Sequence, residues 1–467
     1  MILKREPMSA VDTAWLRMES STNLMMIGVV LVLEDPLDFL RFLALLEDRL
    51  LSFQRFRQKV VQDDGRYYWE DDPYFDIDNH VHRISLAGDG TQLELQKLAA
   101  DLNSTPLCHD MPLWQVHLVD RYQGGSAIIA RIHHCIADGL ALVRVLLSLT
   151  DAPSTAPTSC GPLSEPRAKP YLNGHRNDLW QPARKLIRNT LQQGQELLED
   201  SWDFIREPKQ LVELARQGLV MSSELTRVGI MPPDPPTRLK GRLSGRKRVS
   251  WAEPLNLKEV KEMSRALDAT INDVLLAAAT GALRKYLVRH GDDITNEKIH
   301  VAVPFNLRPL NKPITTLGNE FGLVILPLPI GIHDPLERFE QVRDNMLALK
   351  KSYQAQTFYG LLGALGKGPH GLEKTALELL SRKASAVMTN VPGPTEHLYL
   401  AGSRLKQPMF WVPQSGDVGV GLSIFSYAGS VQFGLIADKN LIPYPDLLMK
   451  DFASSYREIE QLAMAYG

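Results

Sequence analysis

The chain has 467 residues, of which 44% are hydrophobic and 23% are charged, and its formal net charge at pH 7 is -2. A chain of this length exceeds what one hydrophobic core usually supports, and its composition is that of folded domains and not of disordered or collagen-like proteins. The near-neutral charge disfavours a nucleic-acid-binding protein, whose binding domain is normally basic, and favours small molecules or lipids as partners.

Cysteine usage and the N-terminal residues bear on the compartment. Cys108, Cys135 and Cys160 lack the spacing of a disulfide framework or a zinc site, which favours a reducing compartment. Lys4 and Arg5 precede "EPMSAVD" and no apolar run, so no secretory signal is expected. The early apolar run "LMMIGVVLVL" is far shorter than the roughly 20 residues that a membrane span needs. We therefore expect a cytoplasmic protein that meets membranes only from the side.

The first part of the chain alternates helical and strand patterns. Ser9, with Asp12 three residues later, predicts the start of a helix over residues 10–20. "MIGVVLVL" is typical of a buried strand, "LDFLRFLALLEDRLLSF" of an amphipathic helix and "DGRYYWE" of a hairpin. A helix over residues 91–103 and the strands "PLWQVHLVD" and "SAIIARIHH" follow.

Composition then divides the chain into domains. Residues 151–182 are rich in Pro, Ser and Ala, as linkers are, and residues 183–229 are predicted to form amphipathic helices, which we expect either to rest on a membrane or to pack against the domains. The second half alternates predicted helices (255–267, 271–291, 334–353, 371–383 and 444–464) with predicted strands (298–304, 320–328, 384–390, 418–427 and 430–437). We expect two mixed α/β domains, residues 1–150 and 246–467, joined by a linker and helical crossover over residues 151–245.

The segment "SAIIARIHHCIADGLAL", residues 126–142, carries the candidate chemistry. Its apolar alternation ends a strand at His133, and Asp138-Gly139 form a turn before the next helix. Adjacent strand residues face opposite sides, so His133 and His134 cannot both point into one cavity. Three interpretations remain: a buried histidine pair without a chemical role, a metal site with Asp138, or a general base, for which imidazole with its pKa of about 6.5 is suited.

Other catalytic patterns are missing from the sequence. No G-x-S-x-G elbow occurs, and Cys135 and His134 diverge as strand neighbours, which disfavours a nucleophilic pair. No "HExxH" or further metal-ligand cluster appears. The glycine-rich segment "GLLGALGKGPHG", residues 360–371, fits no phosphate-binding pattern and is predicted to be a flexible loop.

"HHCIADG", read as H-H-x-x-x-D-G, resembles the active-site motif of the CoA-dependent acyltransferase superfamily, which includes chloramphenicol acetyltransferase and peptide-synthetase condensation domains. The opening "MSAVDTAWLRMES" resembles that of the bacterial bifunctional wax ester synthase/diacylglycerol acyltransferases. "PLWQVHLVD", "INDVLLAAATGALRKYL", "VPFNLRP", "GNEFG", "TNVPGP" and "GLSIFSYAG" follow in that family's order. The resemblance covers nearly the whole chain, from about residue 8 to about residue 440.

The resemblance implies two domains of chloramphenicol-acetyltransferase type with a channel between them. It also implies transfer of a long-chain acyl group from acyl-CoA, as a substrate, to diacylglycerol or a fatty alcohol, with no cofactor and no metal. His134 is then the general base, a step typically worth about 10²–10⁴-fold in rate. His133 supports it, and Asp138 shapes the loop, in the superfamily by bonding to an arginine. Gly139 would keep the channel clear of side chains.

Three further features keep two interpretations each. Asn272 either faces the site from the second domain or occupies the first turn of a helix beside Asp273. Trp114 either lines the channel or belongs to the core. The basic run "RLKGRLSGRKR", residues 238–248, either meets CoA phosphates or anionic lipid or is a solvated, disordered connector.

Two rival functions follow from the same superfamily. The first is a condensation-type enzyme that acylates an amine, which the lack of an attached carrier-domain motif disfavours. The second is a protein that binds acyl-CoA or lipid without turnover, which the intact His134, Asp138 and Gly139 disfavour. The preferred hypothesis is an O-acyltransferase at the inner face of the plasma membrane or at lipid inclusions.

Overall fold

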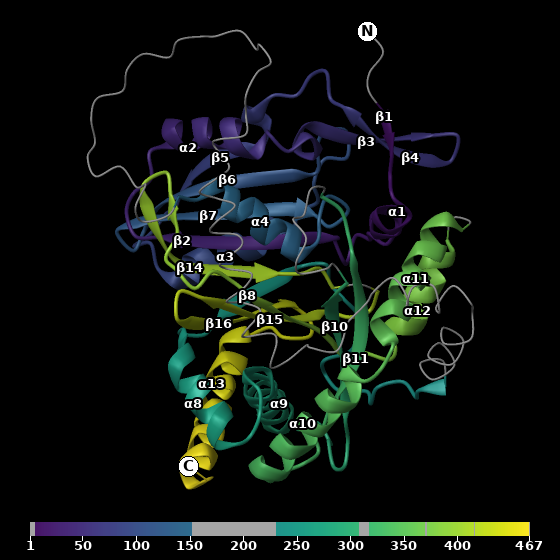
Figure 1. Cartoon of the computed structure of the whole chain (residues 1–467), viewed down its shortest axis with the longest axis vertical. Coiled ribbons are helices and arrows are strands. Elements are labelled where there is room, and N and C mark those ends of the chain that lie inside the picture. Colours follow the sequence, from purple (N-terminus) through teal and green to yellow (C-terminus); the bar gives the residue numbers. More distant parts are fainter. Residues whose placement is uncertain (1–4, 152–229, 308–316, 369–370, 415, 467) are drawn as a thin grey trace.

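Two mixed β-sheets and their covering helices organise the computed structural model of the chain (Figure 1). The structure describes residues 5–151, 230–307, 317–368, 371–414 and 416–466. A six-stranded sheet has the order β13-β14-β2-β7-β6-β5, and a seven-stranded sheet has the order β11-β10-β12-β15-β16-β8, with β9 paired to β16. A small third sheet, β1-β4-β3, lies at the N-terminal end of the molecule (Figure 1).

The elements of the first half follow the alternation that the sequence predicts. Its strands are β1 (Arg5–Pro7), β2 (Met26–Leu33), β3 (Gln58–Asp63), β4 (Arg66–Asp71), β5 (Val81–Ser85), β6 (Trp114–Tyr122) and β7 (Gly125–His133). Its helices are α1 (Ala10–Arg17), α2 (Phe39–Leu45), α3 (Gln92–Asn103) and α4 (Gly139–Leu149), with a π-helical turn η1 (Leu46–Leu50) and 3-10 turns η2 (Gln54–Arg57) and η3 (Ile77–Asn79).

The second half has more elements than the sequence predicts. Its strands are β8 (Lys247–Trp251), β9 (Leu255–Asn256), β10 (Ile299–Asn306), β11 (Phe321–Leu328), β12 (Ala386–Pro392), β13 (Tyr399–Leu400), β14 (Ser403–Trp411), β15 (Val420–Tyr427) and β16 (Ser430–Asp438). Its helices are α8 (Leu257–Ala266), α9 (Ile271–Arg289), α10 (Pro335–Lys350), α11 (Gln354–Lys367), α12 (Leu372–Ser381) and α13 (Pro445–Tyr466).

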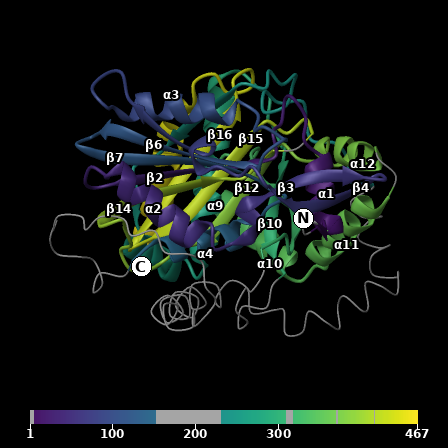
Figure 2. The same ribbon diagram turned by 90° about the horizontal axis from the view of Figure 1, so that it is seen from above.

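Strand β7 divides the first half into two apolar layers. Successive strand residues point to opposite faces, so Ile128 and Ile132 join the core cluster that includes α4, whereas Ala127 and Ile129 join the cluster that includes α3. Figure 2 shows α3 on one side of this sheet and α2 and α4 on the other. The histidine motif continues this strand, so the alternation along β7 determines which face of the sheet each motif side chain points to.

Strand β14 belongs to the second half in sequence but to the first sheet in space. It pairs antiparallel with β2, and Pro408 lies opposite Leu31 in that register. The buried Tyr427 hydroxyl of β15 accepts a hydrogen bond from the Leu398 amide and donates one to the Leu405 carbonyl, at 2.8 and 2.9 Å. These contacts fix the crossing segment against both sheets. The predicted domain bounds stay a prediction.

The predicted helices and strands of both halves are confirmed within a few residues, with two exceptions. The prediction of a flexible loop over residues 360–371 is wrong, because residues 360–367 continue helix α11, which lies beside α1 in both views (Figures 1 and 2). Glycine is a weak helix former, but tertiary packing compensates here: a Cβ on Gly366 would lie 1.6 Å from the Ala10 carbonyl oxygen, so the two helices approach closely.

The prediction of a solvated, disordered connector at residues 238–248 is also wrong. Arg238 pairs with Asp292, and Lys247 is buried in β8. The Lys247 ammonium donates hydrogen bonds to the side-chain oxygens of Asn23 and Gln414, at 2.8 and 2.9 Å. The run is basic and ordered: Lys247 is used inside the protein, whereas Arg242 and Arg246 are exposed. The predicted helices at 183–229 and the linker after Asp151 lie outside the described residues.

Within the described residues, no single helix is both long enough and apolar enough to cross a membrane. One bent pair, α8 and α9, satisfies length and composition together, with an angle of 96° between its helices.

Candidate active site

His134 lies directly beyond the end of β7, in a layer of aromatic side chains. Its ring stacks on Trp15 with 4.3 Å between ring centroids and an angle of 12°, and lies 5.3 Å from the Phe321 ring. Its backbone amide donates to the Met25 carbonyl at 2.7 Å, which extends the β2–β7 pairing by one bond. The residue is only 3% exposed. Helix α1 and strand β11, from opposite halves of the sequence, therefore enclose the imidazole.

This enclosure determines the charge of His134. Burial is the largest influence and lowers the pKa of the imidazole to about 4, against smaller opposite effects of its own backbone and of Asp138. Because a histidine with this pKa is neutral at pH 7, its ring carries a free lone pair. Among the described residues, no partner forms a hydrogen bond of normal geometry with the buried Nδ1 atom. The ring is therefore in the neutral form that can accept a proton.

His133 has a different environment, as the alternation of strand side chains requires. Its Nε2 atom lies 2.7 Å from a carboxylate oxygen of Glu19, and its Nδ1 atom accepts a hydrogen bond from the Cys135 amide at 3.1 Å. Nδ1 is thus the acceptor, so Nε2 carries the proton that faces Glu19. The ring fixes the chain on either side of His134, which fits the supporting role predicted for it.

Glu19 connects His133 to the surface. Burial would raise the pKa of Glu19, but hydrogen bonds from His109 and His133 outweigh it and lower that pKa to about 2. The half-exposed His109 ring lies 3.4 Å from the other carboxylate oxygen, and this contact raises the pKa of His109. The three side chains form a charged group behind the aromatic layer of His134.

Asp138 holds the turn between the motif and helix α4. One carboxylate oxygen accepts from the Ala141 amide at 2.9 Å, which caps the helix, and the other accepts from the Glu320 amide at 3.1 Å. The Asp138 amide donates to the Gly318 carbonyl. Asp138 therefore joins the motif to the "GNEFG" segment of the second half, as a residue that shapes the loop would.

Gly139 is the first residue of α4, and its backbone does not require glycine, because its φ lies outside the left-handed range. A Cβ at this position would meet no heavy atom within 4 Å. Space beside the motif thus remains open, which fits the predicted role in keeping the channel clear.

Asn319 ties His134 to helix α1. Its side-chain amide nitrogen donates to the backbone carbonyl of His134 at 2.8 Å and to a carboxylate oxygen of Asp12 at 2.7 Å. The Asp12 amide donates to the Ser9 side-chain oxygen, which caps α1 as predicted, but the Asp12 carboxylate accepts from Asn319. Burial is the main reason that the pKa of Asp12 rises to about 6.

Asn272 occupies the first turn of α9, where Thr270 and Asp273 form a reciprocal capping box. The Asn272 side-chain oxygen accepts a hydrogen bond from Asn390 of β12. Among the described contacts, none joins Asn272 to His134. The structure thus places Asn272 at the helix start and against the "TNVPGP" segment, and a role in the site stays a prediction.

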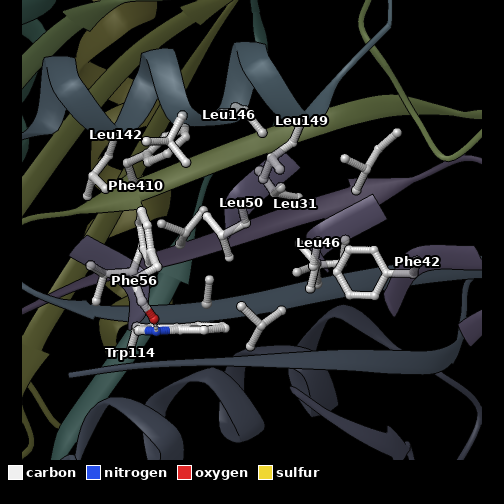
Figure 3. A pocket seen from close by; sticks show the side chains of 17 residues that line it. Leu31, Phe42, Leu46, Leu50, Phe56, Trp114, Leu142, Leu146, Leu149 and Phe410 are labelled. Atoms are coloured by element: carbon white, nitrogen blue, oxygen red, sulfur yellow. Dashed lines mark hydrogen bonds between the residues drawn. The ribbon is translucent and has the colours of Figure 1, made fainter. Parts of the chain in front are cut away.

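Trp114 is both a core residue and a cavity wall. Its indole nitrogen donates to the Phe56 carbonyl at 2.8 Å, and its ring stacks on His80 with centroids 4.5 Å apart. The ring also lines an apolar cavity between the first sheet and α4 (Figure 3). Both interpretations of Trp114 therefore describe the same side chain.

The metal interpretation finds no support in the described part of the chain, where no group of three or more His, Cys, Asp or Glu side chains could hold an ion. The sequence reasoning did not single out Glu19, His109, Asn319 or Phe321. Asn319 and Phe321 lie in the quoted "GNEFG" segment, so that motif was the available signal. Glu19 and His109 offered no local pattern, because folding over 90 residues of separation brings them together.

Comparison with known proteins agrees with this geometry. Residues 8–275 match the model of the wax ester synthase/diacylglycerol acyltransferase catalytic domain, and residues 317–460 match that of the WS/DGAT C-terminal domain. The chain belongs to this family. It is thus an acyltransferase with the α/β fold that the sequence predicted.

Relatives cover most of the chain. A Mycobacterium tuberculosis protein described as a probable diacylglycerol O-acyltransferase is 29% identical over 428 residues, covering 89% of this chain and 87% of the relative. The O-acyltransferase WSD of Acinetobacter baylyi is 27% identical over 384 residues, with coverage of 80% and 79%. The solved wax ester synthase/diacylglycerol acyltransferase of Marinobacter aquaeolei shares the fold, with a TM-score of 0.68, 20% identity and coverage of 98% and 99%.

The buried environment of His134 predicts an unusually low acid limit for activity. Protonation of the imidazole removes the base, so kcat/KM should persist well below pH 6.5 and fall as the pH drops through about 4. The pH profile of kcat/KM measures this. Asp12→Asn is the control, because it removes a second group that titrates near pH 6. A fall of kcat/KM near pH 6.5 in both the native protein and Asp12→Asn would contradict the lowered pKa of His134.

Asn319→Ala should lower kcat by at least about tenfold with little change in KM, because small displacements of a positioned base cost much of the rate. Loss of the donor to buried Asp12 should also lower the free energy of unfolding by about 1–3 kcal/mol. Asn345→Ala is the matched control, since that amide donates to the Pro327 carbonyl elsewhere in the second half. Equal effects of both variants on kcat would refute positioning by Asn319.

Proposed function

We propose that this family member transfers a long-chain acyl group from acyl-CoA to the hydroxyl of diacylglycerol, of a long-chain alcohol, or of both. The products are triacylglycerol and wax esters. The observation that carries the proposal is the buried, neutral imidazole of His134 within an H-H-x-x-x-D-G motif. The names of the relatives support the substrate classes. Acyl-CoA is a substrate, and the reaction uses no cofactor.

The proposed chemistry is one base-assisted acyl transfer. His134 takes the proton of the acceptor hydroxyl while that oxygen forms a bond with the thioester carbonyl carbon. The carbon–sulfur bond then breaks, and the proton passes from the imidazolium to the departing CoA thiolate. No acyl-enzyme forms, so the lack of a serine elbow in the sequence is no obstacle.

The burial of the base serves this chemistry in two ways. A neutral imidazole is the form that can accept a proton, and desolvation keeps it neutral. A dry layer formed by Trp15 and Phe321 also keeps water from competing with the alcohol for the thioester. His133 and Asp138 hold the backbone around the base, and neither is required to exchange a proton with substrate.

The test of function is release of free CoA thiol. Purified protein with palmitoyl-CoA and either hexadecanol or dioleoylglycerol should release thiol and form the corresponding ester. No release with either acceptor would contradict the proposal, and release with a long-chain amine alone would favour an N-acyltransferase. His134→Ala should lower the rate by about 10²–10⁴-fold. His133→Ala should retain more activity, and the reverse order would reassign the base.

We propose in addition that the protein works at a lipid surface, at the inner face of the plasma membrane or at lipid inclusions. Both acceptor classes are lipids that partition out of water, so the enzyme must meet them at such a surface. Flotation with diacylglycerol-containing phospholipid vesicles measures this contact. We expect the protein to float with the vesicles, whereas protein that stays at the bottom of the gradient contradicts the proposal.

A further inference from the structure

We infer that the apolar cavity beneath helix α4 binds part of the acyl chain of the donor. This inference rests on the proposed function and assigns a place to one of its substrates. The cavity lies between one face of the first sheet and the helices α2, η1 and α4 (Figure 3).

The chemistry of the wall suits a hydrocarbon. All the residues that line the cavity are aliphatic or aromatic, and the one lining nitrogen, that of Trp114, is bonded to the Phe56 carbonyl. Such a wall offers a headgroup or a water molecule no free polar partner. An alkyl chain gains from each methylene that it buries, by a factor of about four in affinity.

The cavity runs away from the catalytic motif. Ile132 lines it two residues before His134, and Leu142 lines it in the first turn of α4, where its amide bonds to the Asp138 carbonyl. Figure 3 shows Leu142 and Trp114 toward one end of the cavity and Leu149 and Phe42 toward the other. A chain whose thioester lies at His134 would thus extend along α4 toward Leu149.

The length of the cavity matches a substantial part of a long chain. Leu142 and Leu149 are seven residues apart on a helix, which is roughly 10 Å, and Ile132 and Ile128 are four apart on a strand, which is roughly 13 Å. A staggered hydrocarbon advances roughly 1.25 Å per carbon, from its bond length and angles. The wall along α4 and β7 is therefore as long as roughly eight to ten carbons of an extended chain.

The donor is the better occupant for two reasons. The acyl chain is the one alkyl group common to both proposed reactions, whereas diacylglycerol carries two chains and this cavity lies between a single sheet face and the adjoining helices. The CoA moiety is large and charged, so it must stay outside while the acyl chain enters. A site beyond the base satisfies both conditions.

The far wall contains an irregular helix. Phe42 belongs to the α-helical turns of α2, whereas Leu46 and Leu50 belong to the π-helical turn η1, and all three line the cavity. A π-turn is a rare conformation that is frequent at functional sites. Phe42, Leu46 and Leu50 are spaced four residues apart and share the face that lines the cavity, whereas the neighbouring Leu45 lies outside the lining.

Two filling variants and one control test the assignment. Ala130, the smallest lining residue, lies midway along β7, and Leu46 lies at the far wall. Leu46→Phe should lower kcat/KM for palmitoyl-CoA at least tenfold and leave octanoyl-CoA unchanged. Ala130→Phe should also lower kcat/KM for dodecanoyl-CoA. Leu45→Phe makes the same change one residue away and should leave the acyl-length profile unaltered.

The outcomes separate the alternatives. The filling variants could instead change how kcat/KM depends on the length of the alcohol and leave its dependence on acyl length constant. That result would assign the cavity to the acceptor and overturn the inference. Unaltered profiles in folded Leu46→Phe and Ala130→Phe proteins would overturn it as well. If Ala130→Phe does not fold, as thermal unfolding shows, the comparison of Leu46→Phe with Leu45→Phe decides alone.

A binding measurement distinguishes this inference from the proposed function. Palmitate should displace the fluorescent fatty acid cis-parinarate from the native protein, and Leu46→Phe should weaken palmitate at least tenfold but not octanoate. This result would support the cavity even if no acceptor gave CoA release. Equal affinities in Leu46→Phe and the native protein would overturn the cavity assignment even if the acyltransferase activity were established.

Discussion

The cluster of the three rings of His134, Trp15 and Phe321 is the contact on which the rest of the site depends. It brings together an N-terminal helix, the end of a central strand and a strand of the second half. Removing water from the imidazole lowers its pKa and leaves it neutral. Asn319, from the second half of the chain, joins this cluster to helix α1: its side-chain amide donates to the His134 carbonyl and to the Asp12 carboxylate.

Strand β7 relates the base to the cavity through the two-residue period of a strand. Ile128, Ala130 and Ile132 face the cavity because they alternate with residues that face α3. The strand then ends at His133, whose ring faces Glu19, and the next residue enters the aromatic layer. Because helix α4 returns along the same strand, the acyl chain and the base can share one wall.

The local parts of this arrangement were predictable from the sequence, and the long-range parts were not. Apolar alternation before His133 and the turn at Asp138-Gly139 determine β7 and the start of α4. Helix α11 was missed because its glycines are poor helix formers, although one of them allows the close approach to α1. The burial of Lys247 is not predictable from its basic neighbours, because its partners, Asn23 and Gln414, are distant in sequence.

Burial around His134 also affects the charged side chains that surround it, Asp12 and Glu19. Asp12 is buried to hold Asn319, and its raised pKa of about 6 shows that burial makes its charged form unfavourable. Glu19 is the opposite case, because two histidines stabilise its charge and its pKa falls to about 2. Asp12, whose carboxylate is held mainly by Asn319, therefore loses its charge at a higher pH than Glu19, whose carboxylate is held by two histidines. Asp12 takes up a proton before either Glu19 or His134 does, so the charge of the bridge to Asn319 changes before that of the base as the pH falls.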